Sequence, residues 1–385
     1  MQASRRAATS GSYSAAGLLL ALLLWPAPAH AQSGSTSRTG PISGYMELHL
    51  NKPVDDDIAP TVLDFHRFVL LVAHRFTERI HFFGELELEH AVVEGLEEGG
   101  ELELEQAYLD VLATPEVNFR AGMLLVPVGI INERHEPPTF YGVERPFVDT
   151  VIIPTTWFEV GAGVHGTLGG TVRYRVYAMA PLDAAEFTAE EGLRGSAQHG
   201  VEAQVRSVAW TGRAEYVGIR GLQLGASFWT GNSSVTLQTL DTPTAVIEAD
   251  ARYSRGRFEG RAVYAHAFVD DAAELNDAVF RQTGIDPNVA SELRGFYFEG
   301  GYRVLPAGFP HDLGLFVRYE NFDTQHRMDE GGVPLPQFDR DAWVLGANYW
   351  LDPDVVIKLD YSHVRSQSEV VPGPRSLNIG LGWWF

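Results

Sequence analysis

The chain has 385 residues, no cysteine and a formal net charge of −21 at pH 7. Such an acidic chain lacks the basic face that nucleic-acid binding needs, so we expect no nucleic-acid partner. The absence of cysteine excludes a disulfide framework, and 39 glycines with 11% aromatic residues favour an all-β fold.

The N-terminal segment has the parts of a secretory signal peptide. Arg5 and Arg6 precede a short apolar run at residues 17–25, and Ala29-His30-Ala31 provides a cleavage site. The apolar run is too short to serve as a membrane-spanning anchor, and the residues around the two arginines match a twin-arginine signal poorly. We therefore predict a cleaved signal peptide at residues 1–31.

From residue 44 onward, apolar and polar residues alternate with period two in one segment after another. The last segment places Leu377, Ile379 and Leu381 on one face, with Asn378 and Gly380 on the other. Alternation over about ten residues is typical of transmembrane β-strands, whose apolar face contacts lipid. A soluble β-sandwich would also alternate, but the segment lengths, the aromatic residues at their ends and the export signal favour a membrane barrel.

Sixteen such segments can be counted, with 14 or 18 still open. They are residues 44–50, 64–73, 80–90, 101–113, 117–123, 158–168, 171–180, 209–217, 222–231, 244–254, 257–268, 295–304, 312–322, 340–351, 355–366 and 376–385. Short links follow even segments and mostly longer links follow odd ones, as expected for periplasmic turns and extracellular loops. We predict an all-β, transmembrane antiparallel β-barrel at residues 44–385, in contact with the lipid of a bacterial outer membrane, after a flexible lead-in at 32–43.

Residues 85–105 form a predicted hairpin with two rows of glutamates. The rows are Glu85, Glu87 and Glu89 on one strand and Glu101, Glu103 and Glu105 on the next. Because glutamates facing lipid would be costly, both rows should face the lumen as an acidic pore wall that raises the local cation concentration. A divalent-ion site on these carboxylates and a merely solvated wall are the alternatives.

The longest link, residues 124–157, is the third outer loop and is apolar at both ends. Long loops are usually functional, and irregular backbone at membrane depth is tolerated where it lines a water-filled cavity. We predict that this loop folds into the lumen and narrows the pore; the alternative is a lid on the outer rim. The predicted constriction residues are Glu133, Arg134, His135, Glu136, Glu144 and Arg145.

The crowded charges of this loop also suggest catalysis or metal binding. However, His135-Glu136 lacks a second histidine four positions later, and Pro137 and Pro138 would break the helix that such a zinc motif needs. The sequence also has no G-x-S-x-G motif. We therefore predict no catalytic residue, no metal ligand and no cofactor, and we assign no specific role to His135.

Arginines with the parity of lumen-facing residues lie mainly on later segments. They are Arg173, Arg175, Arg213, Arg252, Arg257, Arg261, Arg303 and Arg318. An arginine-rich arc opposite the acidic hairpin would create a transverse field across the pore. Alternation indicates the face of each residue, but not its height in the barrel.

Residues 118–166 resemble porins related to the phosphate-selective O and P type. The matching residues are Arg120, Gly122, Pro127, Gly129 and the run Glu144-Arg145-Pro146. The resemblance implies a sixteen-stranded trimeric channel with an inward-folded third loop, and a terminal Phe385 that resembles the barrel-assembly signal. Phosphate-selective members depend on arginine ladders and lysine clusters, whereas this chain has two lysines and an acidic hairpin, so no anion-binding residue is carried over.

These patterns lead to one functional prediction. The chain should be an outer-membrane porin for passive diffusion of small hydrophilic solutes, either cation-leaning or weakly selective. The alternatives are a substrate-selective channel for phosphate or another anion, a sugar or a metal complex, and a non-conducting surface-interaction barrel.

Overall fold

The computed structural model describes residues 41–55, 58–93, 100–237, 239–306 and 308–385. The predicted signal peptide and most of the predicted lead-in lie outside the described residues. Within the described part of the chain, no helix is long and apolar enough to cross a membrane.

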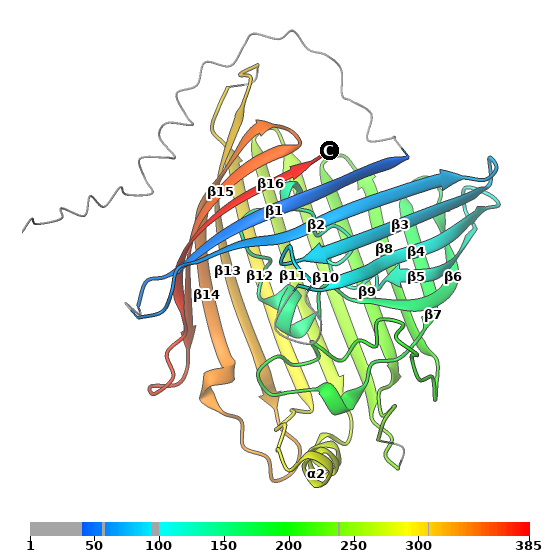
Figure 1. Cartoon of the computed structure of the whole chain (residues 1–385), viewed down its shortest axis with the longest axis vertical. Helices are drawn as coiled ribbons and strands as arrows, with labels where there is room; N and C mark the ends of the chain where they lie inside the picture. The colour runs from blue at the N-terminus through cyan, green and yellow to red at the C-terminus, as the bar shows by residue number, and fades with distance from the viewer. Residues whose placement is uncertain (1–40, 56–57, 94–99, 238, 307) are drawn as a thin grey trace, which may run out of the picture. The chain divides into compact units, whose positions relative to one another are not determined.

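Sixteen antiparallel β-strands close into a barrel (Figure 1). They are β1 (Ile42–Pro53), β2 (Val62–Arg75), β3 (Ile80–Glu89), β4 (Leu102–Leu112), β5 (Asn118–Leu125), β6 (Phe158–Leu168), β7 (Val172–Met179), β8 (Ala209–Ile219), β9 (Leu222–Asn232), β10 (Pro243–Arg255), β11 (Phe258–Val269), β12 (Glu292–Arg303), β13 (Asp312–Arg327), β14 (Asp339–Asp352), β15 (Val355–Ser366) and β16 (Arg375–Trp384). Each strand pairs with its chain neighbours, and β16 pairs with β1. The predicted fold class and strand count are confirmed, and the largest boundary difference is at the end of β13, which extends beyond the predicted residue 322 to Arg327.

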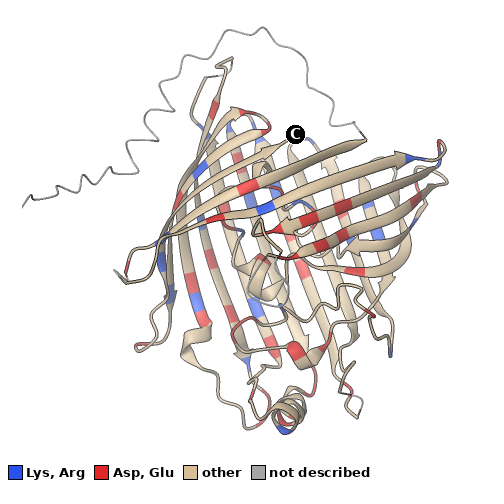
Figure 2. Cartoon of the chain, viewed as in Figure 1, with Lys and Arg blue, Asp and Glu red and all other residues tan. Residues whose placement is uncertain are grey.

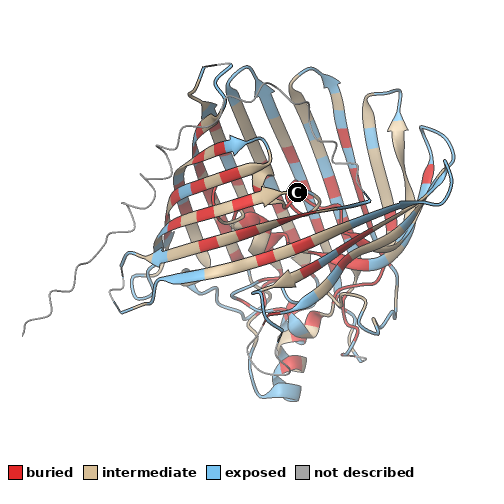
Figure 3. Cartoon of the chain, turned by 45° about the horizontal axis from the view of Figure 1, so that its top comes forward, coloured by how far each residue is buried: buried red, intermediate tan, exposed pale blue. Residues whose placement is uncertain are grey.

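Side-chain alternation accounts for the two faces of the sheet. In β10, Val246, Glu248 and Asp250 are buried, whereas Ile247 and Ala249 between them are exposed. Figure 3 shows this alternation as bands of buried and exposed residues along the strands. The charged side chains of β10 therefore lie on the inner face, together with some apolar ones such as Val246, and the exposed residues on the outer face are apolar, as lipid contact requires.

Short turns and long loops occupy opposite ends of the barrel. Links after even-numbered strands are short, as at 169–171 and 220–221, whereas links after odd-numbered strands include 126–157 and 180–208. The C-terminus lies at the short-turn end, and Figure 1 shows helix α2 (Ala272–Thr283) beyond the other end. This asymmetry is the one that the sequence predicts.

Helix α2 was missed by the sequence prediction, which treats residues 269–294 as a plain loop. Ala272, Leu275 and Val279 are its buried residues, and Gly284 ends it with a φ of 76°. Apolar residues three and four apart and a glycine in a left-handed conformation are standard helix signals. These signals are sufficient to predict the helix, whereas the period-two alternation that identifies the strands does not reveal it.

A β-bulge interrupts the alternation on β4. Glu85 pairs with Gln106 and Leu86 pairs with Leu104, so Glu105 is an extra residue on β4. A bulge of one residue reverses the parity of everything beyond it. Consequently both Glu105 and Gln106 face the interior, and the inward-facing residues after the bulge have even numbers.

Gly122 on β5 is required for the close pairing of β5 with β4. Its φ is +141°, and an added Cβ would lie 2.1 Å from the carbonyl oxygen of Ala107. Because strain and overlap with backbone add together, Gly122→Ala should destabilise the barrel by roughly 3 kcal/mol or more, measured by urea unfolding in detergent micelles. Gly169→Ala is the control: Gly169 also has a positive φ (+56°) but nothing lies within 4 Å, so we expect a loss of about 1 kcal/mol. Equal losses in both variants would contradict the steric argument.

Candidate pore constriction

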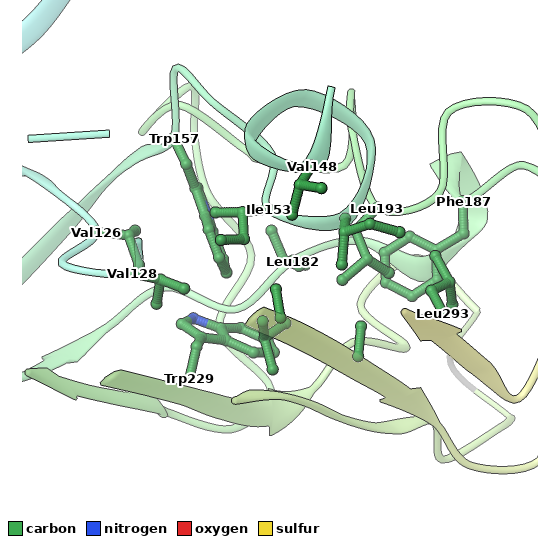
Figure 4. Close-up of a cluster of buried hydrophobic side chains, with 14 of the residues drawn as sticks. Val126, Val128, Val148, Ile153, Trp157, Leu182, Phe187, Leu193, Trp229 and Leu293 are labelled. Carbon is green, nitrogen blue, oxygen red and sulfur yellow. The ribbon is translucent and has the colours of Figure 1, made fainter. Parts of the chain in front are cut away.

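The segment between β5 and β6, residues 126–157, is held at both ends by apolar packing. It contains two short helical turns, η1 (Pro137–Thr139) and η2 (Val148–Ile152). The ring of Trp157 lies 5.4 Å from that of Trp229 on β9. Figure 4 shows both rings in a buried cluster with side chains from the two ends of the segment and from the 180–208 loop. Burial of this much apolar surface fixes where the segment leaves and rejoins the wall.

The middle of the segment is anchored by Tyr141. Its ring stacks on Phe316 of β13 with 5.2 Å between centroids, and its hydroxyl donates a hydrogen bond of 2.9 Å to Glu259 of β11. The ring also lies against Gly301 and Gly314, and a Cβ at Gly301 would approach it to 2.6 Å. The two glycines therefore leave room on the inner face for this ring.

Residues beside Tyr141 contact strands far from β5 and β6 in the barrel order. The Val143 amide donates to Asp360 of β15 (2.6 Å), and Asn348 of β14 donates to the Phe140 carbonyl (3.2 Å). A Cβ on Gly380 of β16 would lie 3.2 Å from a Val143 methyl group. The middle of the segment thus lies against the wall formed by β14, β15 and β16.

A disulfide can test this position because the chain has no natural cysteine. The double variant Val143→Cys/Gly380→Cys should form a disulfide on mild oxidation, since the two side chains are close enough for disulfide geometry. The bond is detected as a reductant-sensitive mobility shift and loss of free thiols. Val143→Cys with Gly256→Cys, in the β10–β11 turn, is the control and should keep both thiols. A lid lying on the rim would leave both thiols free in the first variant as well.

The charged residues predicted for the constriction have different surroundings. Glu133 forms an ion pair with Arg175 of β7, and both side chains are partly exposed. Arg145 donates a hydrogen bond of 2.8 Å to Thr156 within the same segment. Arg134 is exposed. Of these, the Glu133–Arg175 pair connects the segment to the barrel wall.

Glu144 lies against a histidine on β1. Nδ1 of His49 is 3.1 Å from Glu144, and its Nε2 is 3.1 Å from Glu47. Both ring nitrogens face a carboxylate, which acts only as an acceptor, so the ring carries both protons. Burial alone would raise the pKa of Glu144, but the hydrogen bond and charge of His49 outweigh burial and lower that pKa to about 2.

His135 is buried against the acidic hairpin. Its Nε2 lies 3.3 Å from Glu105 and 3.8 Å from Glu85, and its Nδ1 lies 3.0 Å from the Asn132 carbonyl oxygen. Burial alone would lower the pKa of His135, but the two carboxylates outweigh burial and raise the pKa to about 9. The structure thus brings together one residue of the predicted constriction and two of the predicted acidic wall. Glu136 is half-buried beside them.

The two glutamate rows are buried to different depths. Glu85, Glu87 and Glu105 are buried, Glu89 and Glu103 are half-buried, and Glu101 is exposed just before β4 begins. Arg67 of β2 lies 3.4 Å from Glu87. The rows therefore face the interior as predicted by parity, apart from Glu101, but basic residues are interspersed with them.

The predicted separation into an acidic and a basic arc is wrong. Six of the predicted wall arginines lie beside carboxylates: Arg175 with Glu133 and Glu215, Arg213 with Glu215, Glu248 and Asp250, Arg252 with Glu215, Arg261 with Glu299, Arg303 with Glu259 and Asp312, and Arg318 with Glu299 and Glu320. Figure 2 shows basic and acidic bands intermixed on the strands. The physical reason is that buried charges need partners, and neighbouring strands supply them.

Two predicted wall residues are elsewhere. Arg257 lies in the β10–β11 turn and is exposed, so its assignment to the strand wall is wrong. Arg173 is on β7 as predicted but is exposed near the short-turn end. Both positions are consistent with parity, which carries no information on height.

Sequence reasoning missed an ion-paired group just beyond the bulge. Arg120 of β5 donates two hydrogen bonds to Asp110 of β4 (2.8 and 2.7 Å), and its guanidinium lies 4.1 Å from the Tyr108 ring centroid. His165 of β6 contacts Asp110 at 3.0 Å. Parity counted from Glu101 places Tyr108 and Asp110 toward lipid. A charged Asp110 facing lipid would be costly, so its position in the alternation could have indicated the bulge.

Two of the cavities that border the segment differ in the charge of their lining. One of about 240 Å³ is lined by side chains that include Glu85, Glu133, Glu136 and Arg120. The other, of about 530 Å³, is near the short-turn end, where Thr139 of the segment shares the lining with five arginines and one carboxylate. These are Arg173, Arg220, Arg252, Arg261, Arg303 and Glu259. Carboxylates therefore predominate in the smaller of these two cavities and arginines in the larger.

The closed barrel, with apolar residues outside, charged residues inside and loops long at one end only, defines an outer-membrane channel of the porin class. Residues 49–374 match the family described as phosphate-selective porin O and P, and the chain belongs to this family. It is thus an outer-membrane porin, a channel for passive diffusion. An uncharacterized protein of Aquifex aeolicus (strain VF5) is 35% identical over 329 residues, which are 83% of this chain and 74% of that protein.

Several solved porin structures are similar in fold. OmpF of Salmonella typhi, solved with daunomycin, matches with a TM-score of 0.59 and 10% identity over 89% of this chain and 97% of that chain. The outer-membrane channel DcaP of Acinetobacter baumannii gives 0.58 and 12% over 89% and 96%. An anion-selective porin from Comamonas acidovorans gives 0.56 and 11% over 89% and 98%. At these identities the likeness concerns the fold alone.

Proposed function

We propose that residues 126–157 form the constriction of a weakly selective, cation-leaning pore for small hydrophilic solutes. The single observation that carries this proposal is the contact of Tyr141 and Val143 with strands remote from β5 and β6. A segment anchored in this way obstructs the interior of a sixteen-stranded barrel, which would otherwise hold a wide aqueous channel. No chemical step is needed, because size exclusion and the local field are sufficient for filtering.

The sign of the selectivity follows from the smaller cavity. Three carboxylates, Glu85, Glu133 and Glu136, share its lining with one arginine, Arg120. Charges at a narrow, low-dielectric passage influence ion flow more than charges in a wide mouth, because the field is focused there. The cavity therefore supports a preference for cations.

Planar-bilayer recordings under a salt gradient test this proposal. We expect steady ohmic steps and a reversal potential of the sign for cation preference. Glu133→Gln should move the reversal potential toward anion preference, whereas the control Glu330→Gln, on an exposed outer loop, should leave it unchanged. A barrel that is folded but gives no steps would refute the pore, and an unchanged potential in Glu133→Gln would refute the role of this cavity.

An anion-selective channel is the second candidate, and the larger cavity favours it. Five arginines and one carboxylate line this cavity at the short-turn end. Arginine is well suited to binding phosphate because its planar guanidinium makes paired hydrogen bonds. A reversal potential of the opposite sign, with current reduced by millimolar phosphate, would establish this candidate and replace the cation-leaning proposal.

Three further features of the mature protein belong to the same proposal. We infer export with cleavage after Ala31, recognition of Phe385 by the barrel-assembly machinery, and assembly as a homotrimer. One supporting finding is that OmpT of Vibrio cholerae, at a TM-score of 0.53 and 12% identity, is described in a trimer form. N-terminal sequencing should yield Gln32, deletion of Phe385 should reduce insertion, and crosslinking in detergent should yield three-chain species.

A further inference from the structure

Three buried side chains from separate parts of the chain converge at one point. Glu85 comes from β3, Glu105 from the bulge on β4 and His135 from the 126–157 segment, and their donor atoms all lie within 4.8 Å of one another. The imidazole Nε2 lies 3.3 Å from Glu105 and 3.8 Å from Glu85. Two ligands of a tetrahedral ion, each about 2.0–2.2 Å from it, are roughly 3.3–3.6 Å apart. The observed spacing is therefore close to that of ligands around one metal ion.

One carboxylate oxygen of this group has no partner among the described residues. It belongs to Glu105, whose other oxygen faces Nε2 of His135 at 3.3 Å, and all three of these atoms are inaccessible to solvent. The two residues are only 2% and 0% exposed. Buried polar atoms are nearly always paired, because an unpaired one is destabilising. An unpaired buried oxygen of Glu105, beside a second carboxylate and an imidazole, therefore indicates a ligand.

The surrounding hydrogen bonds orient the three side chains for metal binding. Nδ1 of His135 faces the Asn132 carbonyl oxygen, which only accepts, so Nδ1 carries a proton and Nε2 is available as a ligand. The hydroxyl of Tyr45 donates to Glu85 at 3.2 Å, and the amide of Gln106 donates to its other oxygen. Metal-binding histidines usually donate their other ring N–H to a carbonyl or carboxylate, and metal-binding carboxylates usually accept hydrogen bonds from neighbouring donors.

Charge balance also favours a divalent ion. Glu85 and Glu105 bring two carboxylates into a buried position, where negative charge without a cationic partner is costly. Arg67, on the neighbouring strand β2, already forms ion pairs with Glu47 (2.6 Å) and Glu87 (3.4 Å). A divalent ion with a neutral imidazole would make the group neutral.

We propose that Glu85, Glu105 and His135 bind one divalent first-row transition-metal ion of the Zn²⁺ type. Hard ions such as Ca²⁺ and Mg²⁺ prefer oxygen ligands alone, whereas imidazole combined with carboxylates suits Zn²⁺. The cavity of about 240 Å³ that Glu85 lines provides a route of entry. The bound ion would clamp the 126–157 segment to the acidic hairpin. This proposal revises the sequence prediction of no metal ligand, which relied on spacing along the chain.

A second group with similar composition serves as a control. Asp64, His66 and His90 also have donor atoms within 4.8 Å of one another. However, Nε2 of His66 lies 2.8 Å from an Arg67 nitrogen, and arginine only donates, so that lone pair is occupied. Nδ1 of His66 then carries the proton, which points to Asp64 at 3.1 Å. His66 therefore has no free lone pair for a metal.

Metal content of the purified barrel tests the site. The full mature protein, without a histidine tag, is stripped with EDTA in detergent and dialysed against Zn²⁺, and bound zinc is measured per chain. We expect one ion per chain, with affinity at least about tenfold weaker in His135→Gln and in Glu105→Gln. His90→Gln should bind zinc as the unaltered protein does.

Each remaining outcome decides the proposal. No zinc bound by the unaltered protein would overturn it, as would loss of zinc in His90→Gln but not in His135→Gln. If a ligand variant fails to fold, the visible absorption of Co²⁺ bound to the unaltered protein reports the ligands instead, and absence of nitrogen–oxygen-ligated bands overturns the site. Binding is measured in detergent without any channel recording, so failure of the proposed pore function would leave this result intact.

Discussion

Replacing residues 136–145 by a glycine–serine sequence of the same length is expected to raise the single-channel conductance several-fold. The replacement removes Tyr141 and Val143, and with them the contacts to Glu259 and Asp360. It keeps the apolar ends that pack beside Trp157 and Trp229. The freed chain would fluctuate within a barrel wide enough for an aqueous channel, so current should increase and become noisier. Planar-bilayer recordings measure both changes.

The matching control replaces residues 330–335 in the same way, because this outer-loop stretch is exposed throughout. Its conductance should equal that of the unaltered channel. The mobility of unheated samples on a detergent gel verifies that both barrels are folded. A conductance unchanged by replacement of residues 136–145 would mean that these residues do not narrow the pore.

Arg213→Met is expected to destabilise the barrel by about 3–5 kcal/mol, because this is the usual cost of removing one partner from a buried ion pair. Arg213 of β8 contacts Glu215 at 3.1 Å, Glu248 of β10 at 3.0 Å and Asp250 of β10. The Arg213 side chain is 1% exposed and those of Glu248 and Asp250 are 0% exposed. Removing the guanidinium therefore leaves carboxylates that water cannot reach. Urea unfolding in detergent micelles measures the change in free energy.

A rescue variant separates this electrostatic cause from lost packing. Adding Glu248→Gln and Asp250→Asn to Arg213→Met removes the unpaired charges and should recover most of the lost free energy. If the triple variant is no more stable than the single one, the loss comes from packing. A single variant within 1 kcal/mol of the unaltered protein would show that the carboxylates find other partners.

On strands β3 and β4, the sequence predicts which side chains face the interior only as far as the bulge at Glu105. Glu85 and Glu87 follow a regular alternation, and both are buried as predicted. Beyond Glu105 the alternation shifts by one, which brings Tyr108 and Asp110 inward. Whether a strand contains a bulge depends on its pairing with its neighbour, and one strand's own sequence shows this pairing only indirectly.

The meeting of His135 with Glu85 and Glu105 was not predictable. The sequence shows His135 between two glutamates, Glu133 and Glu136, and an acidic hairpin elsewhere in the chain. Which of these carboxylates the ring contacts depends on the route of the segment, which Tyr141 and the apolar cluster determine. Spacing along the chain is informative for ligands on one element, but these three lie on separate elements.

The sequence by itself determined the barrel and the end at which the long loops lie, and it favoured sixteen strands over 14 or 18. The reason is that lipid outside and charged residues inside impose a period of two on every strand, while loop lengths are visible along the chain. Only the tertiary structure decided which charges meet. Register between strands pairs Arg318 with Glu299, and the path of one segment places His135 beside Glu105. Such contacts join residues that are remote in the sequence, so local sequence patterns do not predict them.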